Sequence, residues 1–257
     1  MHISPPKWLS KLIPPDTKRT VAPPGKLRPS PSPHPLPLVV VASFPRSGTH
    51  ILIDLILNNF PAYRRAPLYV NLDEYLLQGL DVDDLIQKGG YVVKTHYPEK
   101  HFCSDNHEAY EKVFANAAIF VPIRSEHDIF CSFQNMVDSK RKEHLVEDHA
   151  AFWEFWSKKA IHTFLFACLI APEKAVPILD EIQSHLGLQR AKRVIGPPDK
   201  RHRLKVYLRK LATRIFGNRL RIVNTTVGFN RGLAHPLAVR MTALQGSRKP
   251  DFRADEA

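Results

Sequence analysis

Short apolar runs alternate with amphipathic stretches through the middle of the chain. The runs at 38–44, 91–96 and 117–123 are dominated by apolar residues, which predicts buried β-strands. A fourth apolar run, at 164–170, is predicted to be a strand as well. Short strands separated by helical stretches indicate βαβ units, and therefore a parallel sheet flanked by helices.

The stretches between these runs repeat apolar residues at helical spacing. This periodicity predicts helices at 49–60 and 126–137, because residues three and four positions apart share one face of a helix. The Ser-x-x-Asp sequence at 125–128 is a capping box that starts the second of them. A further helix is predicted within 172–188, ending at Gly187, since helices commonly end at glycine.

The two ends of the chain differ from its middle in composition. Residues 1–36 are rich in proline, serine and basic residues, and such a segment buries too little apolar area to offset its ordering entropy. We therefore expect a disordered, proline-rich leader at 1–36 and a flexible tail at 247–257. Residues 37–246 are expected to form one α/β domain of P-loop NTPase-like topology, in which ligands bind at the carboxyl ends of the strands.

Charge and cysteine content narrow the function classes. The formal net charge of +12 favours an anionic partner, and nucleic acid, an anionic glycan, a membrane surface and a phosphorylated nucleotide all qualify. Cys103, Cys131 and Cys168 form no CxxC pair, which argues against a disulfide scaffold. A membrane-spanning helix requires about 18 consecutive apolar residues, and the sequence contains no such run. A cytoplasmic protein without a transmembrane segment is expected.

The first polar cluster, Arg46-Ser47-Gly48-Thr49, lies between a predicted strand and a predicted helix. A helix N-terminus offers unpaired N–H groups and the positive end of the helix dipole to an anion. Gly48 permits close approach of the backbone, the hydroxyl residues add donors, and Arg46 adds a fixed charge. The Walker pattern GxxxxGK[ST] is absent. The alternative is that Ser47 only caps the helix.

Two further clusters lie at the ends of the next two predicted strands. Lys94 and His96 lie two apart on an extended segment, so one can neutralise developing charge while the other accepts a proton. Arg124 ends a strand, and Ser132 lies eight residues later on the helix that follows, so that both can hold one phosphate. Taken singly, each cluster also fits ordinary surface residues after a strand.

In order, the three clusters resemble those of the sulfotransferases that use 3′-phosphoadenosine 5′-phosphosulfate (PAPS). "FPRSGTH" is similar to that family's 5′-phosphosulfate loop, "VKTHYP" to its catalytic strand, and "VPIRSEHDIFCS" to its 3′-phosphate motif. The resemblance covers roughly residues 37–190. It implies an enzyme that moves a sulfuryl group from PAPS to a hydroxyl or amine acceptor by in-line transfer, without a metal.

The resemblance also implies roles for individual residues. His96 is the expected general base, while Lys94 and Arg46 stabilise charge on the transferring group. Arg124 and Ser132 are expected to hold the 3′-phosphate. The remaining donor-binding residues expected from the resemblance are Arg46, Ser47, Gly48, Thr49 and His50 at the first loop, with Arg231 and Gly232 as substitutes for the family's C-terminal loop.

Some positions depart from the family pattern. Ile51 stands where a tryptophan often packs on adenine, and His50 either hydrogen-bonds the phosphate or only packs. The aromatic residues Trp153, Phe155 and Trp156 are expected in the core or lining an acceptor cleft. The acceptor is expected to be a small molecule or a glycan.

Basic residues fill the stretch 201–221, in which Leu204, Leu208, Leu211 and Ile215 fall at helical spacing. The pattern predicts an amphipathic helix with either a solvated basic face or a peripheral contact with an anionic surface. Specific nucleic-acid binding is not expected. Two alternatives to the enzyme remain: a catalytically degenerate protein of the PAPS fold that binds an anionic partner, and a P-loop kinase.

Overall fold

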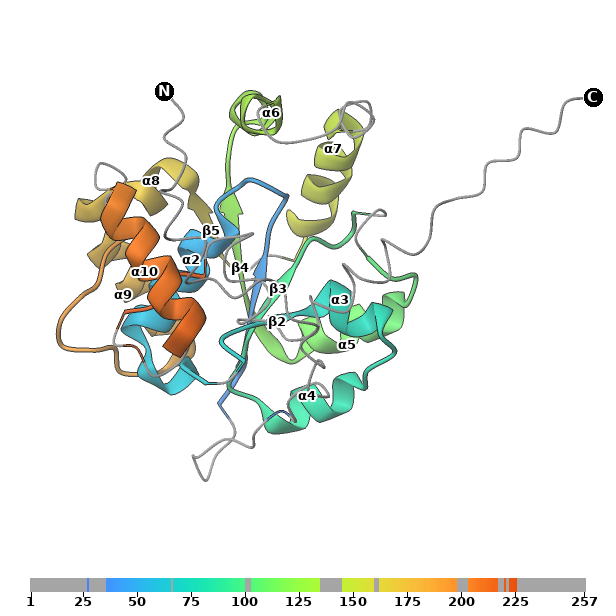
Figure 1. Cartoon of the computed structure of the whole chain (residues 1–257). Helices are drawn as coiled ribbons and strands as arrows, with labels where there is room; N and C mark the ends of the chain where they lie inside the picture. Colours follow the sequence, from blue (N-terminus) through green and yellow to red (C-terminus); the bar gives the residue numbers. More distant parts are fainter. Residues whose placement is uncertain are drawn as a thin grey trace, which may run out of the picture.

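A parallel sheet forms the middle of the molecule, with its strands in the order β2-β3-β1-β4-β5 (Figure 1). The structure is a computed structural model and describes residues 27, 36–65, 67–99, 103–134, 145–159, 162–197, 203–216, 220 and 222–225. The central strand, β1, pairs in parallel with β3 on one side and with β4 on the other. The strands are β1 (Leu38–Ala42), β2 (Val70–Asn71), β3 (Val92–Thr95), β4 (Ala117–Ile123) and β5 (His162–Leu165).

Helices cover both faces of this sheet. One face is covered by α3, α4, α5 and α7, and the other by α2, α8 and α9 (Figure 1). Among the described residues, the α-helices are α2 (Thr49–Asn59), α3 (Leu72–Leu77), α4 (Val82–Lys88), α5 (His107–Ala115), α6 (Glu126–Gln134), α7 (Leu145–Trp156), α8 (Phe166–Ile170), α9 (Ala175–Leu186) and α10 (Arg203–Phe216), and short 3-10 turns lie at Pro61–Tyr63 and Pro172–Lys174.

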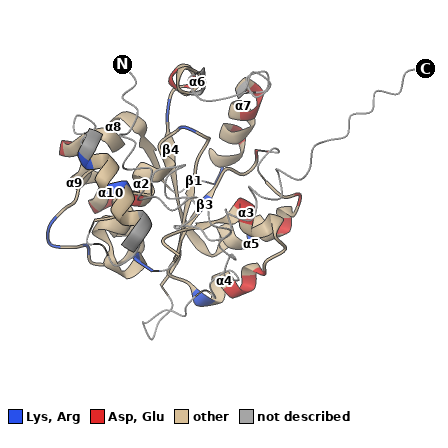
Figure 2. Cartoon of the chain, viewed as in Figure 1, with Lys and Arg blue, Asp and Glu red and all other residues tan. Residues whose placement is uncertain are grey.

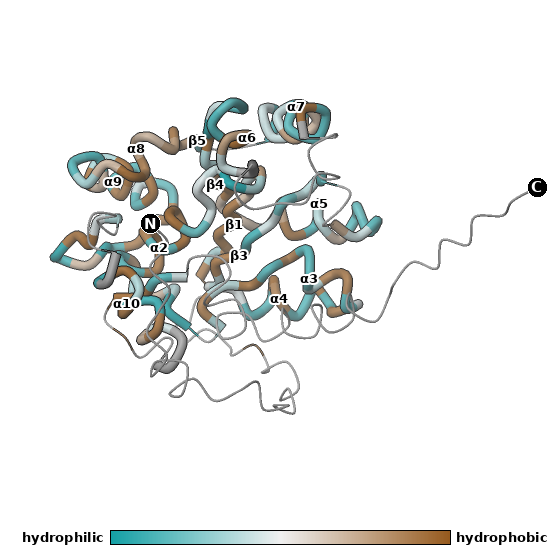
Figure 3. The backbone as a smooth tube through the Cα atoms, turned by 45° about the horizontal axis from the view of Figure 1, so that its top comes forward, coloured by the Kyte–Doolittle hydropathy of each residue, from teal (hydrophilic) through white to brown (hydrophobic). Residues whose placement is uncertain are grey.

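Two separate hydrophobic clusters result from the alternation of side chains along the strands. In β1, Val40 belongs to the cluster under α3, α4, α5 and α7, whereas Val39 and Val41 belong to the cluster under α2 and α9. All three valines are fully buried, and Figure 3 shows β1 as a hydrophobic stretch in the middle of the molecule. A strand buried on both faces is typical of a parallel sheet covered by helices.

The predicted elements are largely confirmed. The three strands expected from apolar runs form β1, β3 and β4, and the helices expected after them form α2 and α6. Helix α9 ends at Gly187, which has the left-handed φ of 61° that favours glycine. The amide of Asp128 donates to Ser125 Oγ at 3.1 Å, as the capping box requires. The α/β fold class with a P-loop-like connection from β1 to α2 is therefore shown.

The strand predicted at 164–170 is wrong over most of its length. The strand β5 covers His162–Leu165, and Phe166 begins helix α8. The parallel ladder with β4 ends at the pair Ile123–Leu165, so the chain beyond this pair has no strand partner. Periodicity does not separate a short buried helix from a buried strand when every residue is apolar.

The expected leader and tail fall almost entirely outside the described residues, and the boundaries of the domain at 37 and 246 stay predictions. Within the part of the chain that the structure describes, no helix has both the length and the apolar character needed to cross a membrane. Of the predicted aromatic group, Trp156 is fully buried, and Trp153 and Phe155 pack against the same cluster. Their predicted place in the core is confirmed, and an acceptor cleft lined by them stays a prediction.

Candidate functional site

The loop between β1 and α2 has a backbone shape suited to an anion. Arg46 has a φ of 73° and Gly48 a φ of 107°, so both lie in the left-handed region. Gly48 is the N-cap of α2, and no side chain caps this helix end. The first N–H groups of a helix have no acceptor within the helix and lie at the positive end of its dipole. The loop therefore offers backbone donors to a negatively charged group.

The two hydroxyl residues of this loop are engaged inside the protein. Ser47 Oγ donates to the carbonyl oxygen of Phe44 at 2.8 Å, and the backbone amide of Ser47 donates to the same oxygen. The Thr49 hydroxyl lies 2.5 Å from the hydroxyl of Ser43. Ser47 does not cap the helix, so that alternative is wrong. Both hydroxyls fix the shape of the loop, and Arg46 and Gly48 are its more accessible residues.

Two arginines from different strand ends meet above this loop. Arg124 Nη1 donates to the carbonyl oxygen of Arg46 at 2.9 Å, and Arg46 Nε donates to Ser132 Oγ at 3.0 Å. The Arg124 guanidinium also lies over the ring of Phe166, 4.3 Å from its centroid. The structure thus brings together the predicted residues of the first and third clusters.

These two guanidinium groups have no carboxylate counter-charge among the described residues. Burial, and then the charge of Arg124, lower the pKa of Arg46. Arg124 Nε is buried and has no hydrogen-bond partner within that same part of the chain. Two like charges brought together in a partly buried place are costly without an opposite charge. An anion with several acceptor oxygens would offset that cost.

His96 lies one residue beyond β3, beside the start of the same loop. Its Nδ1 lies 2.5 Å from the carbonyl oxygen of Ser43, which accepts only, so Nδ1 carries the proton in the neutral ring. This tautomer leaves Nε2 as the nitrogen that can accept a proton. The backbone amide of His96 donates to Asp73 Oδ2 at 2.8 Å. The carbonyl of Ser43 therefore orients the imidazole, and Asp73 fixes the backbone at His96.

Asp73, in the first turn of α3, is a site residue that the sequence analysis missed. Its Oδ1 accepts from Thr95 Oγ1 at 2.5 Å and from the Tyr110 hydroxyl at 3.3 Å. Burial raises the pKa of Asp73, and the charge of Lys94 and the donated hydrogen bonds oppose that rise. No motif marks this aspartate, because its partners come from β3 and α5. Asp73 lies next to Thr95 in space because β2 pairs with β3, and this pairing cannot be read from the sequence around Asp73.

Lys94 is buried in the sheet, with only 8% of its surface exposed. Its sheet neighbours are Val41 in β1 and Asn71 in β2. The charge of Lys94 favours the ionised form of Asp73, the carboxylate that accepts from the His96 amide. Its predicted role in charge stabilisation stays a prediction.

The remaining predicted residues are His50, Arg231 and Gly232. His50 is buried, with Nδ1 3.2 Å from Thr225 Oγ1 and its ring edge-to-face with Tyr69. These contacts give His50 a packing role, and its predicted contact with a phosphate stays a prediction. Arg231 and Gly232 lie outside the described residues.

Helix α2 also carries a buried carboxyl group, Asp54, that binds the chain after α10. Asp54 Oδ1 accepts from both the backbone amide and the hydroxyl of Thr225, each at 2.7 Å. Burial raises the pKa of Asp54 to about 7, and the two bonds from Thr225 and the charges of Arg209 and Lys210 on α10 oppose that rise. Helix α2 and the chain after α10 are therefore coupled through a titratable group.

We expect the free energy of unfolding to fall as the pH rises from about 4 to about 7. The pKa of Asp54 rises from 3.8 to about 7 on folding, so in this window the folded state keeps a proton that the unfolded chain has lost. The contribution of Asp54 to the free energy of unfolding is fully present below its pKa in the unfolded chain. It is lost as the pH rises through its pKa in the folded protein. Urea denaturation at several pH values should show this slope, with a span on the order of a few kcal/mol.

Asp54→Asn should make this slope shallower and leave the part that Asp73 contributes, whose pKa is also raised by burial. Asp105→Asn, a change at an exposed aspartate, should leave the slope unchanged. An equal pH dependence in wild type and Asp54→Asn would show that another group is responsible.

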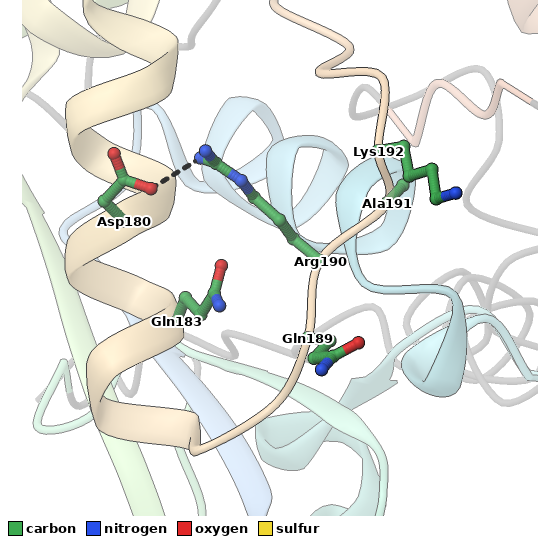
Figure 4. Close-up of a pocket in the computed structure, with 6 residues that line it drawn as sticks. All are labelled: Asp180, Gln183, Gln189, Arg190, Ala191 and Lys192. Atoms are coloured by element: carbon green, nitrogen blue, oxygen red, sulfur yellow. Dashed lines mark ion pairs between the residues drawn. The ribbon is translucent and has the colours of Figure 1, made fainter.

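A hollow elsewhere on the surface has a different character. It lies along α9 and the chain that follows, and Figure 4 shows Arg190 paired with Asp180 across it, with 2.8 Å between Nη1 and Oδ1. Its other lining residues are Gln183, Gln189, Ala191 and Lys192. Its arginine is neutralised by a carboxylate and its lysine is exposed to solvent, whereas the two arginines above the β1–α2 loop are partly buried.

Comparisons with known proteins leave the family open. No family model matches the chain. No curated protein sequence matches it either. Among solved structures, shikimate kinase from Bacteroides thetaiotaomicron shows a likeness with a TM-score of 0.36 and 12% identity, over 60% of this chain and 99% of that chain. A likeness of this size carries no argument about activity, so the fold class depends on the sheet and the loop themselves.

Proposed function

We propose that this protein is a PAPS-dependent sulfotransferase that acts on a hydroxyl or amine acceptor. The broader class is a nucleotide-binding transferase with a P-loop-like fold. The observation that carries the proposal is the pair Arg46 and Arg124 with Ser132, gathered above the N-terminus of α2. These groups and the backbone of the loop supply donors from two strand ends, which suits a ligand that carries two separate anionic groups.

A site for PAPS requires positive charge near both anionic ends of the donor. PAPS carries a 5′-phosphosulfate and a 3′-phosphate, and it is the 3′-phosphate that distinguishes it from ATP. We assign the 5′-phosphosulfate to Arg46 and the backbone around Gly48, and the 3′-phosphate to Arg124 and Ser132. The hydrogen bond from Arg46 to Ser132 couples the two proposed subsites. A multiply charged donor also suits a chain with a net charge of +12.

His96 is the proposed general base of the reaction. In the transfer, the acceptor oxygen or nitrogen forms a bond to sulfur while the bond between sulfur and the bridging oxygen breaks, and 3′-phosphoadenosine 5′-phosphate (PAP) leaves with that electron pair. His96 Nε2 takes the acceptor proton, since Nδ1 already donates to Ser43. Arg46, together with Lys94, stabilises the charge that develops on the oxygens. Asp73 positions His96 through the backbone amide.

A P-loop kinase is the competing transferase for this fold. Kinases with a Walker loop use its lysine to reach the β- and γ-phosphates. Here Arg46 precedes Ser47-Gly48-Thr49, and no lysine stands before the hydroxyl residues. The catalytically degenerate alternative would keep donor binding and lose turnover. Ligand preference and turnover therefore separate the three functions.

Calorimetric titration of the full chain with PAP, ADP and ATP–Mg²⁺ tests the donor site. We expect PAP to bind most tightly, and Arg124→Ala to weaken PAP binding by roughly 10–100-fold, since charge-assisted hydrogen bonds each contribute about 1.5–3 kcal/mol. Arg190→Ala is the matched control, because Arg190 lies in the remote hollow and pairs with Asp180. Tighter binding of ATP–Mg²⁺ than of PAP would favour the kinase and exclude the sulfotransferase.

A further inference from the structure

Helix α10 is packed in the opposite sense to an ordinary surface helix. A surface helix normally turns its apolar side to the core and its polar side to solvent. Among the described side chains of α10, Thr213 is buried, with only 1% exposed, whereas Leu208 is 52% exposed. At about 100° per residue, Leu208 and Leu211 lie about 60° apart on the helix, and each lies about 140–160° from Thr213. The leucines therefore face away from the side that is buried.

Polar contacts attach the inner side of α10. Thr213 Oγ1 accepts from the amide of Asn224 at 3.0 Å and donates to the carbonyl oxygen of Arg209 at 2.9 Å. Arg209 and Lys210 interact electrostatically with the buried carboxyl of Asp54. No described side chain of α10 belongs to either hydrophobic cluster. The helix thus contributes none of its described leucines to the core.

Basic and amphipathic residues border the outward leucines. Lys205 is exposed and Tyr207 is half-buried, and helix geometry places them on opposite sides of the leucine pair. The sequence of α10, RLKVYLRKLATRIF, holds five basic residues and no acidic one, and two of the five, Arg209 and Lys210, interact with Asp54 on the inner side. Lys192 and Arg193, in the segment before α10, are exposed as well. In Figure 2 the acidic residues of α3, α4 and α5 lie on the other side of the sheet from α10.

We propose that the outward face of α10, formed by Lys205, Tyr207, Leu208 and Leu211, docks on a bilayer surface rich in anionic phospholipid. A helix of this kind lies in the interface, where leucines enter the acyl boundary and lysine and tyrosine remain at headgroup level. Nucleic acid or a glycan would engage the basic residues but leave the leucines in water. This proposal does not depend on the proposed transferase activity.

Co-sedimentation of the full chain with vesicles tests the proposal. We expect the protein to bind vesicles of phosphatidylcholine containing phosphatidylserine and to bind pure phosphatidylcholine far less. Leu208→Glu should weaken binding to the anionic vesicles by about tenfold or more. It removes an apolar side chain that docking would bury in the bilayer, and it adds a charge that the anionic lipids repel. Leu77→Glu is the matched control, since Leu77 is a 46% exposed leucine on the acidic side, in α3.

Several outcomes would overturn the proposal. One is an absence of binding to anionic vesicles. Another is equal binding by Leu208→Glu and wild type, which would mean that the basic residues bind polyanions without help from the leucines. A fall of many degrees in the melting temperature of Leu208→Glu would mean that the face is already covered within the folded chain. Self-association in analytical ultracentrifugation that Leu208→Glu abolishes would assign the face to a second copy of the protein.

Discussion

Replacement of His96 by alanine is expected to lower kcat for sulfuryl transfer by about 10²–10⁴-fold, the usual contribution of a positioned general base. The physical reason is the fixed tautomer. Nδ1 donates to the carbonyl oxygen of Ser43, so Nε2 is the proton acceptor, and alanine supplies none. Initial rates with PAPS and an accepted acceptor, together with titration of PAP, separate the chemical step from donor binding.

The affinity for PAP should change little in His96→Ala, because the donor contacts are assigned to the β1–α2 loop and to Arg124. His185→Ala, at an exposed histidine on α9, is the matched control and should keep full activity. If His96→Ala lost PAP binding and kcat in equal proportion, His96 would be part of the donor site or of the fold. Full activity in His96→Ala would exclude it as the base.

Gly48→Ala is expected to destabilise the protein by roughly 2–5 kcal/mol and to abolish PAP binding. Gly48 has a φ of 107°, which an L-residue rarely adopts, and a Cβ there would lie 2.8 Å from Phe166 Cδ2. Phe166 also lies under the Arg124 guanidinium, so its displacement would move an arginine assigned to the donor. Thermal or urea denaturation measures the first effect, and calorimetry with PAP measures the second.

Gly79→Ala separates backbone strain from steric contact. Gly79 also has a positive φ, of 68°, but a Cβ added there meets nothing within 4 Å, so only about 1 kcal/mol is expected. Phe166→Ala in the Gly48→Ala background should recover the part of the loss that comes from the contact. No recovery, with equal losses for both glycines, would show that the conformation of the loop alone accounts for the effect.

Much of the fold was predictable because apolar runs and helical periodicity are local signals. They gave β1, β3, β4, α2, α6 and α9 close to their observed bounds. The run at 164–170 failed because it is apolar throughout, and the end of the β5 ladder depends on where β4 ends. The two-residue strand β2 has no periodicity to detect and is defined by its pairing with β3.

The candidate site was predictable only for residues that follow strands directly. Arg46, His96 and Arg124 all lie at or just after the end of a predicted strand, and parallel pairing brings such positions to one edge of the sheet. Asp73 and Phe166 were missed because their roles arise from tertiary contacts with Thr95, His96 and Arg124. The sequence also did not show that the Ser47 and Thr49 hydroxyls bond within the loop.

Helix α2 carries polar side chains that hold distant segments in place. Asn58 exchanges two hydrogen bonds with the backbone of Val223, and Asn59 exchanges two with the backbone of Ile195. A chain cut short of either segment would leave these buried amides without their partners, a cost of about 1–3 kcal/mol for each orphaned group. The smallest autonomous folding unit must therefore extend to about Thr225, some sixty residues beyond the last strand of the sheet, which ends at Leu165.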